Sequence, residues 1–243
     1  MEVHSFGHRG NPPLILLHGI GAGHRLWLRQ IERFQQTHFV LTPDMPGFTG
    51  PAVANEPDIQ DVANSLTTEI DLQALGPVSL CGISAGASVA LAMAARLGSG
   101  VSRLIVSAPQ VRPPRFMLNL QIAICTLMPE TTLIATASGA LRSDPEIATA
   151  AAEDCRALGK RGLLAAMNAL RMMDLHPELS RITAPTFVFC GEKDRVNLPA
   201  ARAITAALGN ANLLIAPGAG HLWNVLAPEQ FNDTPADALS API

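Results

Sequence analysis

Short apolar runs recur along the chain and alternate with longer stretches of helical periodicity. The runs are nearly continuous in apolar residues, which is typical of strands buried on both faces of a parallel sheet. They occupy residues 14–17, 39–42, 78–81, 104–106, 186–190 and 213–216. The stretches between them predict helices near residues 26–34, 58–75, 85–97, 198–208 and 228–239, and Gly98 and Gly209 follow two of these as left-handed helix ends. The alternation predicts a doubly wound, mostly parallel α/β sheet.

One long stretch breaks this alternation. Between residues 111 and 181 there is no strand pattern, and helical patterns occur near 116–128, 131–141, 145–158 and 161–173. A structureless loop of this length is uncommon in a compact domain. We therefore predict a helical insertion over residues 112–181 within a core formed by residues 1–111 and 182–243. The insertion carries one charge, Glu130, between residues 116 and 141. Its apolar side chains either line an apolar pocket or, as we expect for most of them, pack the insertion onto the sheet.

Composition excludes several other classes of protein. With 243 residues, a net charge of −3 and no run of like charges, the chain has no electrostatic footprint for nucleic acid. No apolar stretch is long enough for a membrane span. The first residues do not have the pattern of a secretory signal. The four cysteines form no Cys-x-x-Cys pair, and Cys81 and Cys190 are expected to be buried, reduced thiols. Reduced thiols favour a cytoplasmic location.

Residues 82–86, Gly-Ile-Ser-Ala-Gly, match the G-x-S-x-G pattern. They follow a predicted strand and precede a predicted helix, so a sharp turn would hold Ser84 in a strained conformation with its hydroxyl exposed. The same turn would put the Ala85 N–H at a helix N-terminus, where it can stabilise a developing negative charge. The alternative is that Ser84 is only a helix cap between two glycines.

A serine nucleophile needs a base and a carboxylate. His221 follows the glycine-rich residues 217–220 after the last predicted strand, and Asp194 follows the strand at 186–190. Because parallel strands end at one edge of a sheet, these side chains can meet Ser84 there. His18 also ends a strand, although shaping the turn at Gly19 is its favoured role.

Glu192 competes with Asp194 for the carboxylate position. The order Ser…Asp…His along the chain, which Asp194 satisfies, is the one expected of this architecture. After the strand at 14–17, the turn His18-Gly19-Ile20-Gly21 can aim the Ile20 N–H at an oxyanion, opposite Ala85. A rival interpretation makes this turn a dinucleotide-binding loop with Asp44 as the ribose carboxylate, but the third glycine would fall at His24.

Taken together, these parts make the sequence similar to the α/β-hydrolase superfamily over about residues 13–231, and more narrowly to small bacterial serine esterases and lactonases. The resemblance rests on the segments 18–19, 44–47, 82–86, 191–194 and 218–221. It implies Ser84 as nucleophile, Asp194 as acid, His221 as base and a helical cap, with no metal or organic cofactor. The short N-terminus implies seven or eight strands, the first missing and the second reduced to residues 1–6.

The resemblance predicts a serine hydrolase that cleaves an ester or lactone of a small, apolar substrate through an acyl-enzyme. A carbon–carbon bond hydrolase, a thioesterase or an acyltransferase would use the same triad. A non-catalytic member of the fold that binds a small molecule is the alternative from a different class. The sequence does not determine the oligomeric state.

Overall fold

A computed structural model describes residues 1–53 and 56–240. Its centre is a seven-stranded sheet in the order β1-β3-β2-β4-β5-β6-β7. The strands are β1 (Val3–Phe6), β2 (Pro13–Leu17), β3 (Phe39–Pro43), β4 (Val78–Ile83), β5 (Val101–Ser107), β6 (Thr186–Gly191) and β7 (Ala211–Ala216). β1 runs antiparallel to β3, and all other neighbouring strands are parallel. The predicted doubly wound α/β class is confirmed, and the reduced strand expected within residues 1–6 spans Val3–Phe6.

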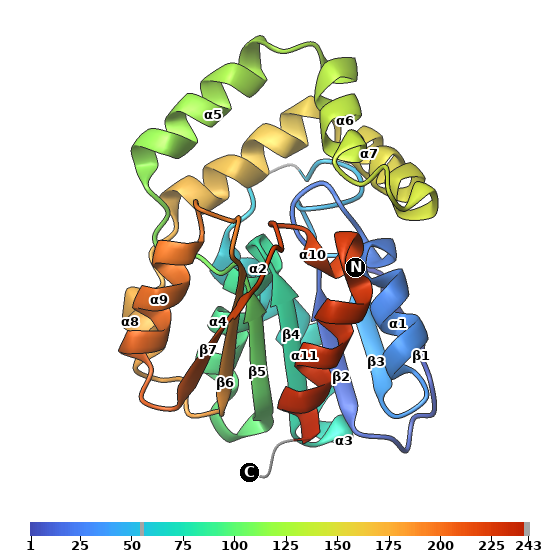
Figure 1. The fold of residues 1–243 in the computed structure, drawn as a ribbon, viewed down its shortest axis with the longest axis vertical. Coiled ribbons are helices and arrows are strands. Elements are labelled where there is room, and N and C mark those ends of the chain that lie inside the picture. Colours follow the sequence, from blue (N-terminus) through green and yellow to red (C-terminus); the bar gives the residue numbers. More distant parts are fainter. Residues whose placement is uncertain (54–55, 241–243) are drawn as a thin grey trace.

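Helices cover both faces of this sheet (Figure 1). The core helices are η1 (His24–Trp27), α1 (Leu28–Phe34), α2 (Ile59–Glu69), α3 (Leu72–Leu75), α4 (Ala85–Leu97), η2 (Gly98–Gly100), α9 (Leu198–Ala207), α10 (Trp223–Leu226) and α11 (Pro228–Ser240). Successive strand residues point to opposite faces of the sheet, so the side chains of each apolar run pack into two hydrophobic cores, one on each face. Leu14 and Leu16 belong to the core under α1 and α11, whereas Ile15 and Leu17 belong to the core under α2 and α4.

Four further helices lie between β5 and β6: α5 (Arg115–Leu127), α6 (Glu130–Gly139), α7 (Pro145–Met172) and α8 (His176–Leu179). Helices α5 to α7 form a layer beyond the carboxyl ends of the strands (Figure 1). The two helices predicted near 145–158 and 161–173 correspond to α7, which is kinked at Gly159, where φ is +66°. The backbone N–H of Leu175 donates to the carbonyl of Val111 at 2.8 Å, so the two ends of this excursion meet.

Two helix predictions were wrong in detail. The stretch 58–75 is two helices, because Ile70 is extended with its side chain buried and Asp71 then caps α3 at the Ala74 N–H. Gly98 has the expected positive φ of +53°, but Gly209 does not, because α9 ends earlier, with an extended Leu208.

The expectation that most apolar side chains of the insertion pack onto the sheet was wrong for α5. None of its residues is buried, and Phe116 and Leu127 are 79% and 87% exposed. The apolar periodicity correctly predicted that α5 is a helix, but it does not indicate whether other elements cover its apolar side chains. Among the helices of the described residues, none combines the length and the apolar character that crossing a membrane requires.

Candidate active site

Ser84 stands between β4 and α4 in a strained backbone conformation, with φ +57° and ψ −121°. Only two described residues other than glycine have a positive φ, and the second is Ala108, which directly follows β5. Such a conformation is costly, and it persists only where its surroundings impose it. The Ser84 N–H donates to the carbonyl of Ser107 at 2.9 Å, which fixes the turn to the end of β5.

The glycines on either side of Ser84 are required by close backbone approach. A Cβ at Gly82 would lie against the carbonyl of Gly86 and 2.7 Å from the Ala87 nitrogen. A Cβ at Gly86 would lie against the carbonyl oxygens of Leu17 and His18 at the end of β2. Glycine at both positions permits this close backbone approach. The chain can therefore turn directly from β4 into α4, with Ser84 at the end of the sheet.

Asp194 and His221 are brought together from two separate loops at the carboxyl ends of β6 and β7. The Nδ1 atom of His221 lies 2.7 Å from Oδ2 of Asp194. Asp194 is 7% exposed, whereas the His221 side chain is 39% exposed and faces solvent in part. Burial alone would raise the pKa of Asp194, but the hydrogen bonds from His221 and Asn197 outweigh it and hold that pKa below its ordinary value. The carboxylate is therefore ionised at neutral pH.

Asn197 completes the surroundings of this carboxylate, and the sequence argument missed it. Its Nδ2 donates to both oxygens of Asp194 at 2.9 Å, and its backbone N–H donates to Oδ1 at 3.3 Å. Its own Oδ1 accepts a hydrogen bond from Nε2 of Gln110 at 2.8 Å. The only sequence signal for this residue was an asparagine three positions after the acid, where a short turn can fold its amide back.

The His221 loop reaches the turn at Ser84 through Ser107. The ring Nε1–H of Trp223, two residues after His221, donates to Oγ of Ser107 at 2.9 Å, and the Ser107 carbonyl accepts from Ser84. Within the described part of the chain, no hydrogen bond joins the Ser84 hydroxyl to His221. Hydrogen bonds of this kind are often long in structures without substrate.

Ile20 and Ala85, the expected oxyanion donors, flank the same region. Ala85 is the first residue of α4, and the carbonyl of Phe48 accepts from the N–H of Gly21, next to Ile20, at 2.8 Å. For the ranges 1–53 and 56–240, neither the Ile20 N–H nor the Ala85 N–H has a hydrogen-bond partner.

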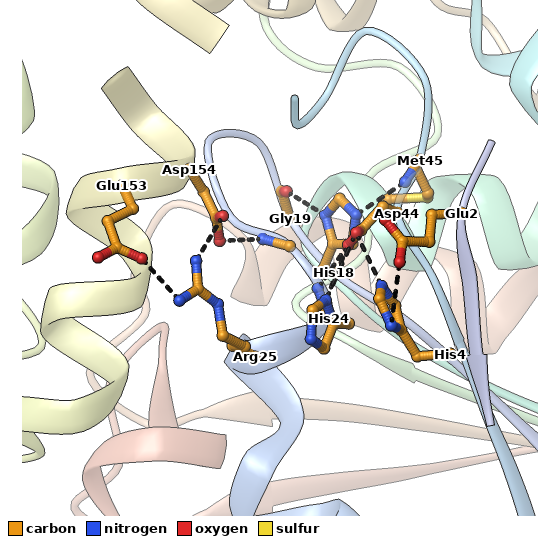
Figure 2. A network of polar contacts seen from close by, with 11 residues as sticks. Glu2, His4, His18, Gly19, His24, Arg25, Asp44, Met45, Glu153 and Asp154 are labelled. Carbon is orange, nitrogen blue, oxygen red and sulfur yellow. Dashed lines mark hydrogen bonds and ion pairs between the residues drawn. The ribbon is translucent and has the colours of Figure 1, made fainter. Parts of the chain in front are cut away.

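The competing residues have other partners. Glu192 accepts a hydrogen bond from the Gly218 N–H at 2.8 Å and makes no contact with His221 among the described interactions. His18 is fully buried, and burial lowers its pKa. Its Nδ1 lies 2.8 Å from the Gly19 carbonyl, and its Nε2 accepts from the Met45 N–H at 2.9 Å (Figure 2). His18 is therefore a neutral residue that shapes the turn, as expected.

Two further expectations concern other polar groups. Cys81 and Cys190 are buried, free thiols, and burial raises the pKa of each to about 12. Asp44, the ribose carboxylate of the dinucleotide interpretation, instead accepts a hydrogen bond from the His24 N–H at 2.7 Å and contacts His4.

A cavity of about 470 Å³ lies between the loop after β3 and the helices α5 and α7. Its walls are mainly apolar, with Val53, Pro57, Ile122 and Leu164 among them, and Arg161 and Glu56 supply charge. None of the five predicted site residues lines it. One of its lining residues, Gly47, precedes Phe48, whose carbonyl accepts the hydrogen bond from the N–H of Gly21.

Comparison with known proteins gives a consistent result. The model of the alpha/beta hydrolase family matches residues 14–234, and the chain belongs to this family. It is 24% identical over 236 residues to 3-oxoadipate enol-lactonase 2 of Acinetobacter baylyi, covering 94% of this chain and 88% of that protein. It is 28% identical over 255 residues to a protein of Pseudomonas savastanoi pv. phaseolicola named as a carbamate hydrolase, RutD, covering 99% and 98% of the two chains.

Solved structures agree with this fold. The enol-lactonase from Burkholderia xenovorans LB400 superposes with a TM-score of 0.85 at 19% identity, covering 99% of this chain and 96% of that one. The esterase EaEST from Exiguobacterium antarcticum superposes with a TM-score of 0.83 at 20% identity, covering 98% and 95%. Together with the family match, they identify the protein as a hydrolase of the α/β-hydrolase fold.

Proposed function

We propose that this protein is a serine hydrolase that cleaves a carboxylic ester or lactone through Ser84, His221 and Asp194. The observation that carries the proposal is the 2.7 Å contact between His221 and the buried Asp194, at the sheet edge where Ser84 has its strained turn. A carboxylate on Nδ1 leaves Nε2 of the imidazole as the free base. The names of the lactonase and carbamate hydrolase relatives fit acyl chemistry of this kind.

In the proposed mechanism, Nε2 of His221 takes the Ser84 proton while Oγ of Ser84 attacks the substrate carbonyl. The N–H groups of Ile20 and Ala85 stabilise the oxyanion, and Asp194 stabilises the imidazolium. His221 then gives its proton to the leaving alcohol, and an acyl group remains on Ser84. A water deprotonated by His221 attacks this ester, releasing the acid and restoring the Ser84 hydroxyl.

We propose that the helical segment 112–181 is a cap over this site and that the 470 Å³ cavity holds the part of the substrate away from the reacting carbonyl. Its apolar walls favour a small, largely apolar group. A thioesterase, an acyltransferase or a carbon–carbon bond hydrolase would use the same three side chains. A panel of short and long acyl esters, lactones and thioesters distinguishes these activities. The four free cysteines fit a cytoplasmic location, which we also propose.

The decisive experiment is labelling with a fluorophosphonate, which reacts only with an activated serine. The protein should be labelled once, and Ser84→Ala should abolish labelling and lower kcat on the best substrate of the panel by about 10⁴–10⁶-fold. Ser99→Ala, which changes an exposed serine in η2, is the matched control and should leave both unchanged. Absence of labelling in a folded protein would favour a non-catalytic, small-molecule-binding member of the family.

A further inference from the structure

Away from the proposed triad, three side chains from separate segments meet at the edge of the sheet (Figure 2). His4 belongs to β1, His24 begins η1, and Asp44 directly follows β3. One nitrogen or oxygen atom from each lies within 4.8 Å of the corresponding atoms of the other two. We call this group the His4–His24–Asp44 cluster.

Two of the three spacings in this cluster match those between ligands of one ion. Nε2 of His4 lies 3.1 Å from Oδ2 of Asp44, and Nδ1 of His24 lies 3.4 Å from it. Two ligand atoms of a tetrahedral zinc ion, each about 2.05 Å from the metal, lie roughly 3.3 Å apart. The imidazole rings of His4 and His24 stack on each other, with centroids 3.6 Å apart and an interplanar angle of 28°.

Surrounding groups orient the three side chains. Oδ1 of Asp44 accepts the His24 backbone N–H at 2.7 Å, which leaves Oδ2 facing the rings. The Asp44 N–H donates to the Glu2 carbonyl at 2.9 Å. The Glu2 carboxylate lies 3.8 Å from Nδ1 of His4, the ring nitrogen that does not face Asp44. Carboxylates and backbone groups in such positions fix ligand orientation in metal sites.

Charge and exposure suit a cation. Asp44 supplies a carboxylate as the anionic donor, and its Oδ2 is the oxygen that the rings of His4 and His24 both face. The side chains of His4, His24 and Asp44 are 21%, 24% and 24% exposed, which gives an ion a path from solvent.

We propose that His4, His24 and Asp44 form a binding site for one divalent transition-metal ion, Zn²⁺ being the type ion, with water at the fourth position. Two imidazoles and one carboxylate are the donors that such ions prefer. In binding, the ring nitrogen of each histidine that faces Asp44 offers its lone pair to the ion, and the imidazole carries its proton on the other nitrogen. The bound ion would join β1, the edge strand, to η1 and the end of β3, and its effect is on stability and not on the acyl chemistry.

The test begins with protein stripped by a chelator and titrated with Zn²⁺ alone by calorimetry, and with Co²⁺ alone by visible absorption. One ion per chain should bind, Co²⁺ should give the intense bands of four-coordination, and Zn²⁺ should raise the Tm. His4→Ala and Asp44→Asn should weaken Zn²⁺ binding at least tenfold and remove the Tm shift. His176→Ala is the matched control, because it removes an exposed histidine that also contacts an aspartate, Asp174, and it should bind as the unchanged protein does.

Equal Zn²⁺ affinity in the unchanged protein and in His4→Ala would overturn the proposal, as would loss of binding in His176→Ala alone. X-ray absorption on the unchanged, Zn²⁺-loaded protein makes the test independent of how the variants fold. Two imidazoles in the zinc shell support the site, and fewer than two refute it.

Discussion

At the scale of single residues, a chain of polar contacts fixes the orientation of the proposed base. Gln110 holds the amide of Asn197, Asn197 donates to both oxygens of Asp194, and Asp194 contacts His221. These side chains come from the loops that follow β5 (Gln110), β6 (Asp194 and Asn197) and β7 (His221). Because the carboxylate is almost fully buried, its orientation depends on these donors and not on solvent.

Asp194→Asn should lower kcat by about 10³–10⁴-fold, because an amide favours the wrong imidazole tautomer and cannot stabilise the imidazolium. Glu192→Gln is the matched control from the same loop and should have a far smaller effect, since Glu192 contacts only the Gly218 N–H among the described interactions. Steady-state kinetics on one ester measures both variants. A larger loss in Glu192→Gln would reassign the acid.

At the scale of elements, the turn from β4 into α4 depends on how closely α4 approaches the end of β2. Gly86→Ala should destabilise the fold by about 1–3 kcal/mol, because its Cβ would meet two carbonyl oxygens that belong to backbone and cannot move aside cheaply. The measurement is urea denaturation followed by circular dichroism.

Gly139→Ala is the control for this effect. A Cβ at Gly139, at the end of α6, has open space around it, so the change should be neutral or stabilising by up to about 1 kcal/mol. If both alanines had the same effect, close approach would not be the reason for glycine at position 86.

The elements also show which features the sequence could predict. Strands such as β2 and β4 were predictable because both faces are buried, which leaves an uninterrupted apolar run. Ser84, Asp194 and His221 were candidates because each follows such a run. Asn197 was not, because an amide that contacts a carboxylate has no sequence pattern of its own.

The break at Ile70 was missed for a related reason. A single residue with a buried side chain and an extended backbone does not interrupt an apolar period. The exposure of α5 was missed because its periodicity is the same whether or not the apolar face is covered. Local pattern determines the type of element, whereas burial depends on neighbours far away in the sequence.

At the scale of the whole molecule, stability should fall as the pH drops below about 6.5. Burial lowers the pKa of His18 in the folded state, so below the unfolded value the unfolded chain binds a proton that the folded chain does not. The stabilisation from neutral His18 is therefore present in full above the pKa of the unfolded state, and it is lost progressively as the pH falls from there toward the lower pKa of the folded state. His18→Gln should reduce the slope of unfolding free energy against pH, measured by urea denaturation between pH 5 and 7.5. An unchanged slope would mean that the pKa of His18 is the same in the folded and unfolded states.

The hydrogen bond between Leu175 and Val111 has a consequence for how the molecule can vary. Both residues are buried in the core, so the two ends of the segment 112–174 are held together next to the sheet. The length of this segment therefore does not set the positions of β5 and β6. The entropy of closing a loop grows only with the logarithm of its length, and doubling the length costs about 0.6 kcal/mol. Residues can therefore be gained or lost in the excursion while the strand register and the turn at Ser84 stay the same. On the proposal that this segment caps the site, such changes would alter substrate preference without altering the fold of the core.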